Sequence, residues 1–388
     1  MPPRRPPDPP RDALIITAPG LEGLAQWELA ALGIPATAED PGAVEAALSL
    51  REVMRANLHL RTASRVVIRL AEFKALTFAD VEKHAKRVAW ETVVTPGRRV
   101  RFRVTCRKSR LYHSGAVAQR LKEALAGRVP GALVAGAAGE DEEDGLGEQL
   151  FVVRLFRDRL VLSADTSGAL LHRRGYRQAT AKAPLRETLA AAMLLGAGWD
   201  GRRPLADPLC GSGTIPIEAA MIARRMAPGR ARTFAFEQWP GHDAAEWRRV
   251  REEAAGAELT SAGVEISASD RDAGGVAATR ENAARAGVAG DLAVAQQSLS
   301  ALRVGTEPGL LVVNPPYGIR VGDKGPLRDL FAQLGNVARA QAAGWRLAML
   351  SADRDLERQV RLPFTEAWKS TNGGIPVRLV TAEVPVHA

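Results

Sequence analysis

Cysteine and aromatic residues are scarce in this chain of 388 residues, and no long apolar run occurs in it. The two cysteines, Cys106 and Cys210, have no Cys or His neighbour at metal-ligand spacing, so we expect neither a metal site nor a disulfide framework. So little cysteine is typical of a reducing compartment, and we expect a cytoplasmic protein. No apolar stretch reaches the ~18 residues of a membrane helix, so no membrane partner is expected.

The N-terminus also lacks an apolar segment, although proline makes up six of its first ten residues. A secretory signal needs a continuous apolar core, so this segment does not fit one. We expect residues 1–12 to form a disordered, proline-rich leader.

Negative charge is outweighed by positive charge, with a formal net charge of +9 and a pI of about 10.0. Such a balance favours polyanionic partners, because Lys and Arg release counterions from a phosphate backbone. Two basic stretches contain aromatic residues, one between residues 98 and 122 and one between residues 172 and 186. Either alone would be an ordinary solvated face, but together they indicate an RNA-binding surface. Its candidate residues are Arg107, Lys108, Arg110, Tyr112, Arg173, Arg174 and Arg177.

The first 165 residues have a mixed α+β pattern. Apolar alternation and turn residues predict strands at 13–17, 44–48, 65–70 and 100–105, and a hairpin of 150–156 with 160–165. Helical spacing predicts helices at 21–32, 51–60, 78–88 and 114–125.

After residue 166 strands and helices alternate, which predicts a parallel sheet covered by helices on both faces. The expected strands are 204–207, 263–270, 292–295, 310–314 and 346–351, the expected helices are 214–225, 271–286 and 326–343, and 364–370 with 377–384 form an antiparallel hairpin. Asp207, Asp270 and Asn314 fall at strand ends, where ligands of such sheets bind.

A glycine-rich turn follows the first of these strands, from Asp207 through Cys210, Gly211, Ser212 and Gly213 to Thr214. Glycines let the backbone approach a ligand, and the helix that follows offers free N–H groups. The spacing fits neither the dinucleotide fingerprint nor a P-loop, and it predicts a nucleoside cofactor site.

Asp270 ends the next strand, where its carboxylate can accept both hydroxyls of a ribose. It lies much further from the glycine-rich turn than the ~30 residues of a βαβ unit. An insertion, residues 227–253, must therefore separate the two strands.

Residues 314–317 read Asn-Pro-Pro-Tyr, directly after a buried apolar strand. The side-chain oxygen of Asn314 and the carbonyl of Pro315 can accept hydrogen bonds from one amino group, while Pro316 stiffens the turn. Tyr317 can stack on a flat base. These four residues predict a catalytic site that orients an exocyclic amine towards a methyl donor.

Three segments resemble the bacterial THUMP-domain RNA guanine-N2 methyltransferases, most of all their large-subunit (23S) rRNA branch: 172–192, 207–220 and 314–318. The resemblance implies S-adenosylmethionine as cofactor, held by the glycine-rich turn and Asp270, and RNA as partner. It implies a class I, Rossmann-like methyltransferase domain with a mixed seven-stranded sheet at 166–388. A ferredoxin-like part at 13–50 and a THUMP RNA-binding domain at 51–165 would precede it. Where relatives carry an adenine-contacting Asp, this chain has Ser298.

Other functions stay open at this point. The same tetrapeptide chemistry serves tRNA guanine-N2, DNA adenine-N6 and protein glutamine-N5 methylation, and a non-catalytic RNA-binding protein is a further alternative. A carbon-5 pyrimidine methyltransferase is disfavoured, because Cys210 lies in the cofactor turn and not where a nucleophile is needed. We expect a monomer without metal, and no second methyltransferase domain, since the sequence ends at Ala388.

Overall fold

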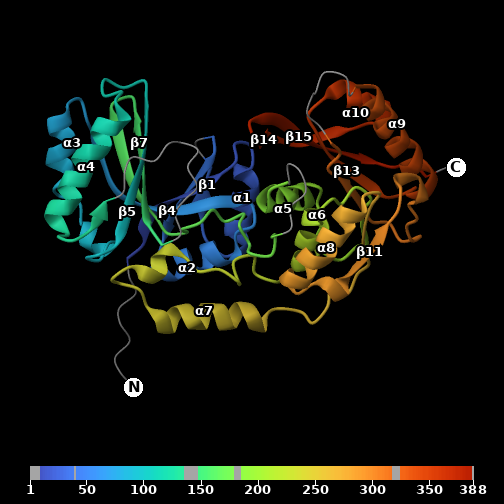
Figure 1. The fold of residues 1–388 in the computed structure, drawn as a ribbon, viewed down its shortest axis with the longest axis horizontal. Helices are drawn as coiled ribbons and strands as arrows, with labels where there is room; N and C mark the ends of the chain where they lie inside the picture. Colours follow the sequence, from blue (N-terminus) through green and yellow to red (C-terminus); the bar gives the residue numbers. More distant parts are fainter. Residues whose placement is uncertain (1–8, 39–40, 135–146, 179–184, 317–323, 387–388) are drawn as a thin grey trace. The chain divides into compact units, whose positions relative to one another are not determined.

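The computed structural model describes residues 9–38, 41–134, 147–178, 185–316 and 324–386 (Figure 1). The chain forms two compact units, and each takes a segment from the sequence of the other. Unit 1 comprises residues up to 16, 26–171 and 232–252; unit 2 comprises 17–25, 172–231 and 253–388.

Unit 2 contains the mixed seven-stranded sheet that was predicted, and the structure gives its strand order as β11-β10-β9-β12-β13-β15-β14. The first five pair in parallel, and β15 runs antiparallel to β13 and β14. Its strands are β9 (Leu205–Asp207), β10 (Ile266–Asp270), β11 (Leu292–Gln296), β12 (Leu310–Val313), β13 (Arg346–Ser351), β14 (Thr365–Asn372) and β15 (Ile375–Glu383).

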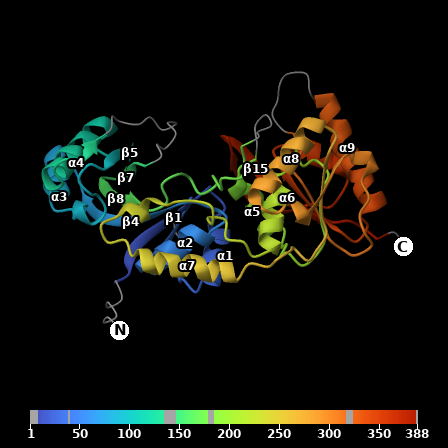
Figure 2. The same ribbon diagram turned by 60° about the horizontal axis from the view of Figure 1, so that its bottom comes forward.

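Helices cover both faces of this sheet (Figures 1 and 2). One core contains residues of α5 (Glu187–Gly196), α6 (Thr214–Ala223) and α8 (Ala273–Ala286), and the other contains residues of α9 (Lys324–Gln341) and α10 (Arg354–Val360). Central strand β12 serves both, because Leu310 and Val312 enter the first core while Leu311 and Val313 enter the second. A strand buried on both faces reads as an unbroken apolar run, which is why it was recognisable in the sequence.

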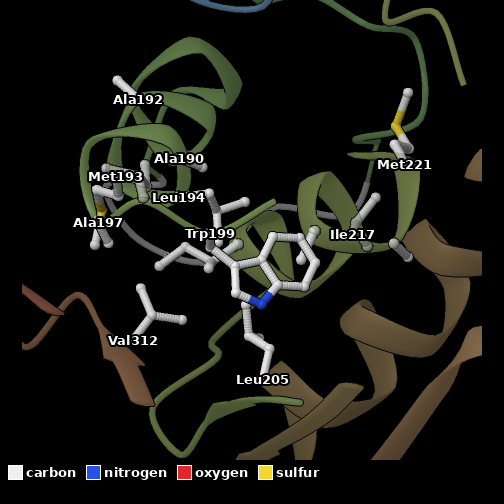
Figure 3. Packing of buried hydrophobic residues seen from close by; sticks show 14 of the residues in the cluster. Ala190, Ala192, Met193, Leu194, Ala197, Trp199, Leu205, Ile217, Met221 and Val312 are labelled. Carbon is white, nitrogen blue, oxygen red and sulfur yellow. The ribbon is translucent and has the colours of Figure 1, made fainter. Parts of the chain in front are cut away.

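The first core packs small side chains around a few large ones. Figure 3 shows Trp199, Leu205, Ile217 and Val312 in this cluster beside the alanines of α5. Burying one large aliphatic side chain contributes roughly 1.5–3 kcal/mol, so this core anchors β9 and β12 together. The two strands that carry the candidate site are therefore firmly held.

Unit 1 contains an eight-stranded sheet in the order β2-β3-β1-β4-β8-β7-β5-β6. Its strands are β1 (Arg11–Thr17), β2 (Ala36–Thr37), β3 (Ala43–Leu48), β4 (Ala63–Lys74), β5 (Arg99–Arg107), β6 (Leu133–Val134), β7 (Gln149–Phe156) and β8 (Arg159–Asp165). Its helices are α2 (Leu50–His59), α3 (Phe78–Ala85) and α4 (Ser114–Arg128), while α1 (Glu22–Ala31) and α7 (Ala244–Gly256) each contain residues of both units. Strand β1 begins at Arg11, inside the expected leader.

Local sequence signals account for several helix starts. Ser49 and Glu52 form a reciprocal capping box on α2, and Thr77 and Asp80 form one on α3. Asp272 caps the start of α8 by accepting hydrogen bonds from two backbone N–H groups of the first turn. These caps satisfy backbone donors that the helices leave free.

Residues 232–252 of the predicted insertion pack within unit 1. Arg232 donates to the carbonyls of Ala169 and Leu170, and the indole N–H of Trp239 donates to the Gln149 side chain at 2.8 Å. Phe234, Phe236 and Trp247 form an aromatic cluster with ring centroids 5.2–5.7 Å apart. The insertion is therefore an integral part of unit 1 rather than a loose loop.

Candidate active site

The candidate site lies where the strand order of the unit 2 sheet reverses. Strand β9 pairs with β10 on one side and with β12 on the other. Asp207 is the last residue of β9, and Asn314 directly follows β12. Because both strands run parallel, with Ala206 opposite Leu311, their carboxyl ends meet at one edge of the sheet. Such a switch point is where open α/β sheets bind ligands.

Gly213 gives the glycine-rich turn its shape. It adopts a left-handed backbone with φ +83° at the N-cap of α6. A Cβ there would lie 2.6 Å from the Thr279 side chain, so no other residue fits without rearrangement. The turn thereby brings the free N–H groups of α6 to the sheet edge.

Side chains of helix α8 donate hydrogen bonds to the glycine-rich turn, and these residues were not predicted from the sequence. Thr279 donates its hydroxyl to the carbonyl of Gly211 at 2.9 Å, and the Asn282 amide donates to the carbonyl of Ser212 at 3.0 Å. Gly275 permits this close approach, because a Cβ there would lie 2.9 Å from the Gly211 oxygen. Their only sequence signal is a glycine pair in the first turn of a helix, which indicates close packing.

Cys210 lies within the turn with its thiol buried beside Thr279. Burial raises the pKa of the thiol, so it stays protonated and unreactive. Its backbone N–H donates to the Ser269 carbonyl, which ties the turn to β10.

Asp207 is 2% exposed, and this burial raises the pKa of its carboxyl to about 8. The N–H of Leu209 donates to it at 3.1 Å and lowers the pKa, whereas the neighbouring Asp270 carboxylate raises it further. A buried carboxyl at this edge will ionise more easily when a cationic ligand is present.

The Asp270 carboxylate fixes the backbone of the glycine-rich turn through a hydrogen bond. One carboxylate oxygen accepts from the N–H of Gly211 at 2.9 Å, and the other accepts from the N–H of Asp272 at 3.0 Å. A carboxylate has about four acceptor positions, so acceptor capacity remains for ribose hydroxyls.

Asn314 carries the observation that bears most directly on chemistry. Its side-chain oxygen is buried and accepts no hydrogen bond among the described residues. Pro315 is buried beside it and Pro316 is exposed. An unsatisfied buried acceptor costs about 1–3 kcal/mol, so it indicates a place for a donor from a ligand. Tyr317 lies outside the described residues.

Ser298 is exposed, and its hydroxyl pairs with that of Ser300 at 2.9 Å. The preceding residue, Gln297, contacts β10 instead: its N–H donates to the Asp270 carbonyl and its amide donates to the Ser269 hydroxyl. Gln297 thus joins the ends of β10 and β11, which sequence spacing did not show.

The prediction that Arg174 contacts RNA is wrong, because Arg174 is 3% exposed and pairs with buried Glu218 at 3.4 Å. Tyr176 also bonds to this carboxylate, at 3.2 Å. Arg177 pairs with Glu187 and donates to the Leu185 carbonyl, so it too acts mainly inside unit 2. Of the three candidate RNA-binding residues in this stretch, Arg173 is the exposed one.

The candidate RNA-binding residues of unit 1 lie on its surface, where Arg107, Lys108, Arg110 and Tyr112 are all exposed. Within the described ranges, no group of His, Cys, Asp and Glu is arranged to hold a metal ion. No helix in the described part of the chain has the length and apolar character needed to cross a membrane.

Comparison with known proteins identifies the family. Residues 174–381 match the family described as RMKL-like, methyltransferase domain, and residues 12–67 match the RlmL ferredoxin-like domain. The chain belongs to the RMKL-like methyltransferase family. It is 33% identical to "Putative RNA methyltransferase YpsC" of Bacillus subtilis, with 93% of each chain covered.

Two further comparisons bear on fold and extent. The structure of SMU.472, solved in complex with SAH, has a TM-score of 0.87 at 29% identity and covers 98% of this chain and 100% of that one. The Ribosomal RNA large subunit methyltransferase K/L of Syntrophotalea carbinolica is 36% identical over 95% of this chain but only 53% of its own length. The chain thus spans about half the length of the K/L relatives that it matches.

Proposed function

We propose that this chain methylates the exocyclic N2 amine of a guanosine in large-subunit (23S) rRNA. The observation that carries the proposal is the buried, unsatisfied oxygen of Asn314 at the switch point. An amide oxygen there suits an amino donor, and a guanine amine held by two acceptors has its lone pair aimed out of the ring plane. The K/L relatives are named for ribosomal RNA, which favours rRNA over tRNA as the substrate.

S-adenosylmethionine is the cofactor, and when bound it supplies an electrophilic methyl group on a sulfonium. The residues of the switch point fit it. The turn at Gly211–Thr214 offers backbone N–H groups, Asp270 offers acceptors for ribose hydroxyls, and the buried Asp207 carboxyl suits a cationic ligand.

The chain's own contribution to the reaction is orientation. Asn314 and the Pro315 carbonyl would accept the two amine N–H groups, and the stiff Pro315-Pro316 turn would fix both acceptors. No side chain has to remove a proton before transfer, so positioning accounts for much of the rate enhancement. We place Tyr317 against the guanine ring as a stacking residue.

We propose that RNA binding and methyl transfer belong to different parts of the chain. We assign residues 13–50 and 51–165 to ferredoxin-like and THUMP parts that bind RNA, and 166–388 to the methyltransferase. Residues 232–252 of the insertion belong to unit 1, and we assign them to the same RNA-binding part of the chain as residues 13–165. We also propose that the protein acts in the cytoplasm as a monomer.

Replacing Asn314 tests the proposal. We expect Asn314→Ala to lower turnover at least tenfold, equivalent to about 1.4 kcal/mol of barrier, and to leave S-adenosylmethionine affinity within a few-fold. Asn336→Ala, an exposed position on α9, is the matched control. If Asn314→Ala keeps more than about a tenth of the wild-type turnover, the amine-orienting role is wrong.

A further inference from the structure

Two segments of unit 1 come together at one end of its sheet. Strands β5 and β7 pair in parallel, with Arg107 opposite Phe156, the last residues of both strands (Figure 1). The segment 108–113 after β5 and the two-residue turn between β7 and β8 therefore leave the sheet side by side. The N–H of Arg157 in that turn donates to the carbonyl of Arg107.

Hydrogen bonds fasten these two segments to each other. The Asp158 carboxylate accepts from the N–H of Arg110 at 2.7 Å, and the N–H of Asp158 donates to the Ser109 hydroxyl at 3.0 Å. Ser109 in turn donates to the Arg107 carbonyl at 3.0 Å. The backbone of these segments is therefore held in a fixed arrangement before any partner binds.

Three non-glycine residues of these two segments have a strained, left-handed backbone. Lys108, Arg157 and Asp158 have positive φ values of 50°, 49° and 63°. Glycine or asparagine normally occupies positions with such φ values, among them the hairpin-turn positions of Arg157 and Asp158, and each strained residue costs on the order of 1 kcal/mol. Long cationic side chains at positions where glycine would relieve strain indicate that the side chains themselves are needed.

Six residues of these segments and of the adjoining end of β7 are exposed, and we call them the loop-end surface: Arg107, Lys108, Arg110, Tyr112, Arg154 and Arg157. Tyr112 is 71% exposed, and its ring contacts that of His113, with 4.1 Å between the ring centroids. The guanidinium carbons of Arg154 and Arg157 lie 5.3 and 5.2 Å from the centre of the Phe156 ring, so both groups make cation–π contacts with it.

We propose that the loop-end surface binds an unpaired segment of the substrate RNA, with its cations on the phosphates and one base stacked on Tyr112. This inference rests on the proposed RNA methyltransferase function. An exposed aromatic ring offers its face, and only an unpaired base can present a face in return, whereas bases within a duplex are already stacked. The surrounding guanidinium and ammonium groups then follow the backbone without reading its sequence.

Binding of the full chain to two fluorescent RNAs tests this, one a single strand of about 12 nucleotides and the other a blunt-ended duplex that contains the same strand. We expect Tyr112→Ala to weaken single-strand binding at least about fivefold, the lower range for one stacked base. Duplex binding should change less than about twofold. Tyr112→Phe should bind like the wild type, because it keeps the ring.

Charge is tested with matched triple variants at two salt concentrations. Arg107→Gln, Arg110→Gln and Arg157→Gln together should reduce the log–log salt slope by about 2–3, since each phosphate contact contributes roughly 0.7–0.9. The control changes Arg202, Arg248 and Arg358 to Gln, all highly exposed and located elsewhere. It removes the same net charge and should leave the slope within about one contact of the wild type.

Three results would overturn the loop-end surface as the binding site: unchanged affinity in Tyr112→Ala, equal weakening of duplex binding, or equal slopes in the two triple variants. Failure of the underlying function is distinguishable, because the wild-type chain itself would then bind neither RNA. Cofactor affinity and thermal unfolding, measured for every variant, should match the wild type if the changes act only on RNA.

Discussion

Replacing Asp207 with Asn should make the ligand-free protein more stable at neutral pH. The carboxyl is buried, and its pKa of about 8 lies well above the ordinary Asp value of 3.8. The folded state therefore keeps a proton that the unfolded state loses, so stability falls as pH rises between these two values. Each pKa unit corresponds to about 1.4 kcal/mol, which makes the loss on the order of 4 kcal/mol by pH 7.

Melting temperatures measured from about pH 4.5 to about pH 8.5 test this loss of stability, because that range covers most of the interval between the ordinary pKa of 3.8 and the folded-state pKa of about 8. Asn is nearly isosteric and cannot ionise, so the melting temperature of Asp207→Asn should exceed that of the wild type by several degrees near pH 8. Near pH 4.5 the two should approach each other. Asp329→Asn, on the exposed side of α9, is the control and should follow the wild-type curve. Parallel curves for Asp207→Asn and wild type would refute the reasoning.

The same group links cofactor binding to pH. A cationic ligand at the switch point favours the ionised carboxylate, so binding should release protons below about pH 8 and tighten as pH rises. Calorimetry in buffers of different ionisation enthalpy detects this release. In Asp207→Asn the release should disappear and the affinity should fall.

Two further substitutions probe the turn. Gly213→Ala should destabilise unit 2 by more than about 2 kcal/mol in urea unfolding, because it combines a positive φ with a Cβ 2.6 Å from Thr279. Gly211→Ala is the control, because Gly211 has a φ of +54° but open space around it. Equal losses of stability in the two variants would show that crowding by Thr279 is unimportant. Asp270→Ala should weaken S-adenosylmethionine binding by roughly 1.5–3 kcal/mol in calorimetry through loss of a charge-assisted acceptor and of the Gly211 hydrogen bond; an unchanged dissociation constant would show that the ribose is held elsewhere.

Much of unit 2 could be predicted, because its signals are local. The apolar run of β12 and the glycine-rich turn are continuous in sequence and occur as expected. Helix α5 was not predicted, since the residues from Glu187 to Leu194 are all buried and leave no polar face to reveal a period. Helices α7 and α10 were also missed: α7 lies in the insertion, and α10 is only seven residues long.

Contacts between distant residues could not be predicted. Arg174 lies in a run of basic residues and was read as part of a surface, yet its partner Glu218 is 44 positions away. The support of the turn by Thr279 and Asn282 likewise depends on how α8 packs. Glu218 is needed because a buried Arg174 charge must have a partner, and Thr279 and Asn282 are needed because the buried carbonyls of the turn must be hydrogen-bonded. Neither need produces a recognisable pattern in a single sequence.

The central claim is that the switch point methylates guanine N2 in RNA, and nucleoside mass spectrometry tests it most directly. The full chain is incubated with methyl-deuterated S-adenosylmethionine and either large-subunit rRNA or tRNA, and each RNA is then digested to nucleosides. The account predicts labelled N2-methylguanosine from the rRNA, absent with the Asn314→Ala variant. Labelled N6-methyladenosine, a label only in the tRNA, or no labelled nucleoside from an enzyme that binds cofactor would contradict it.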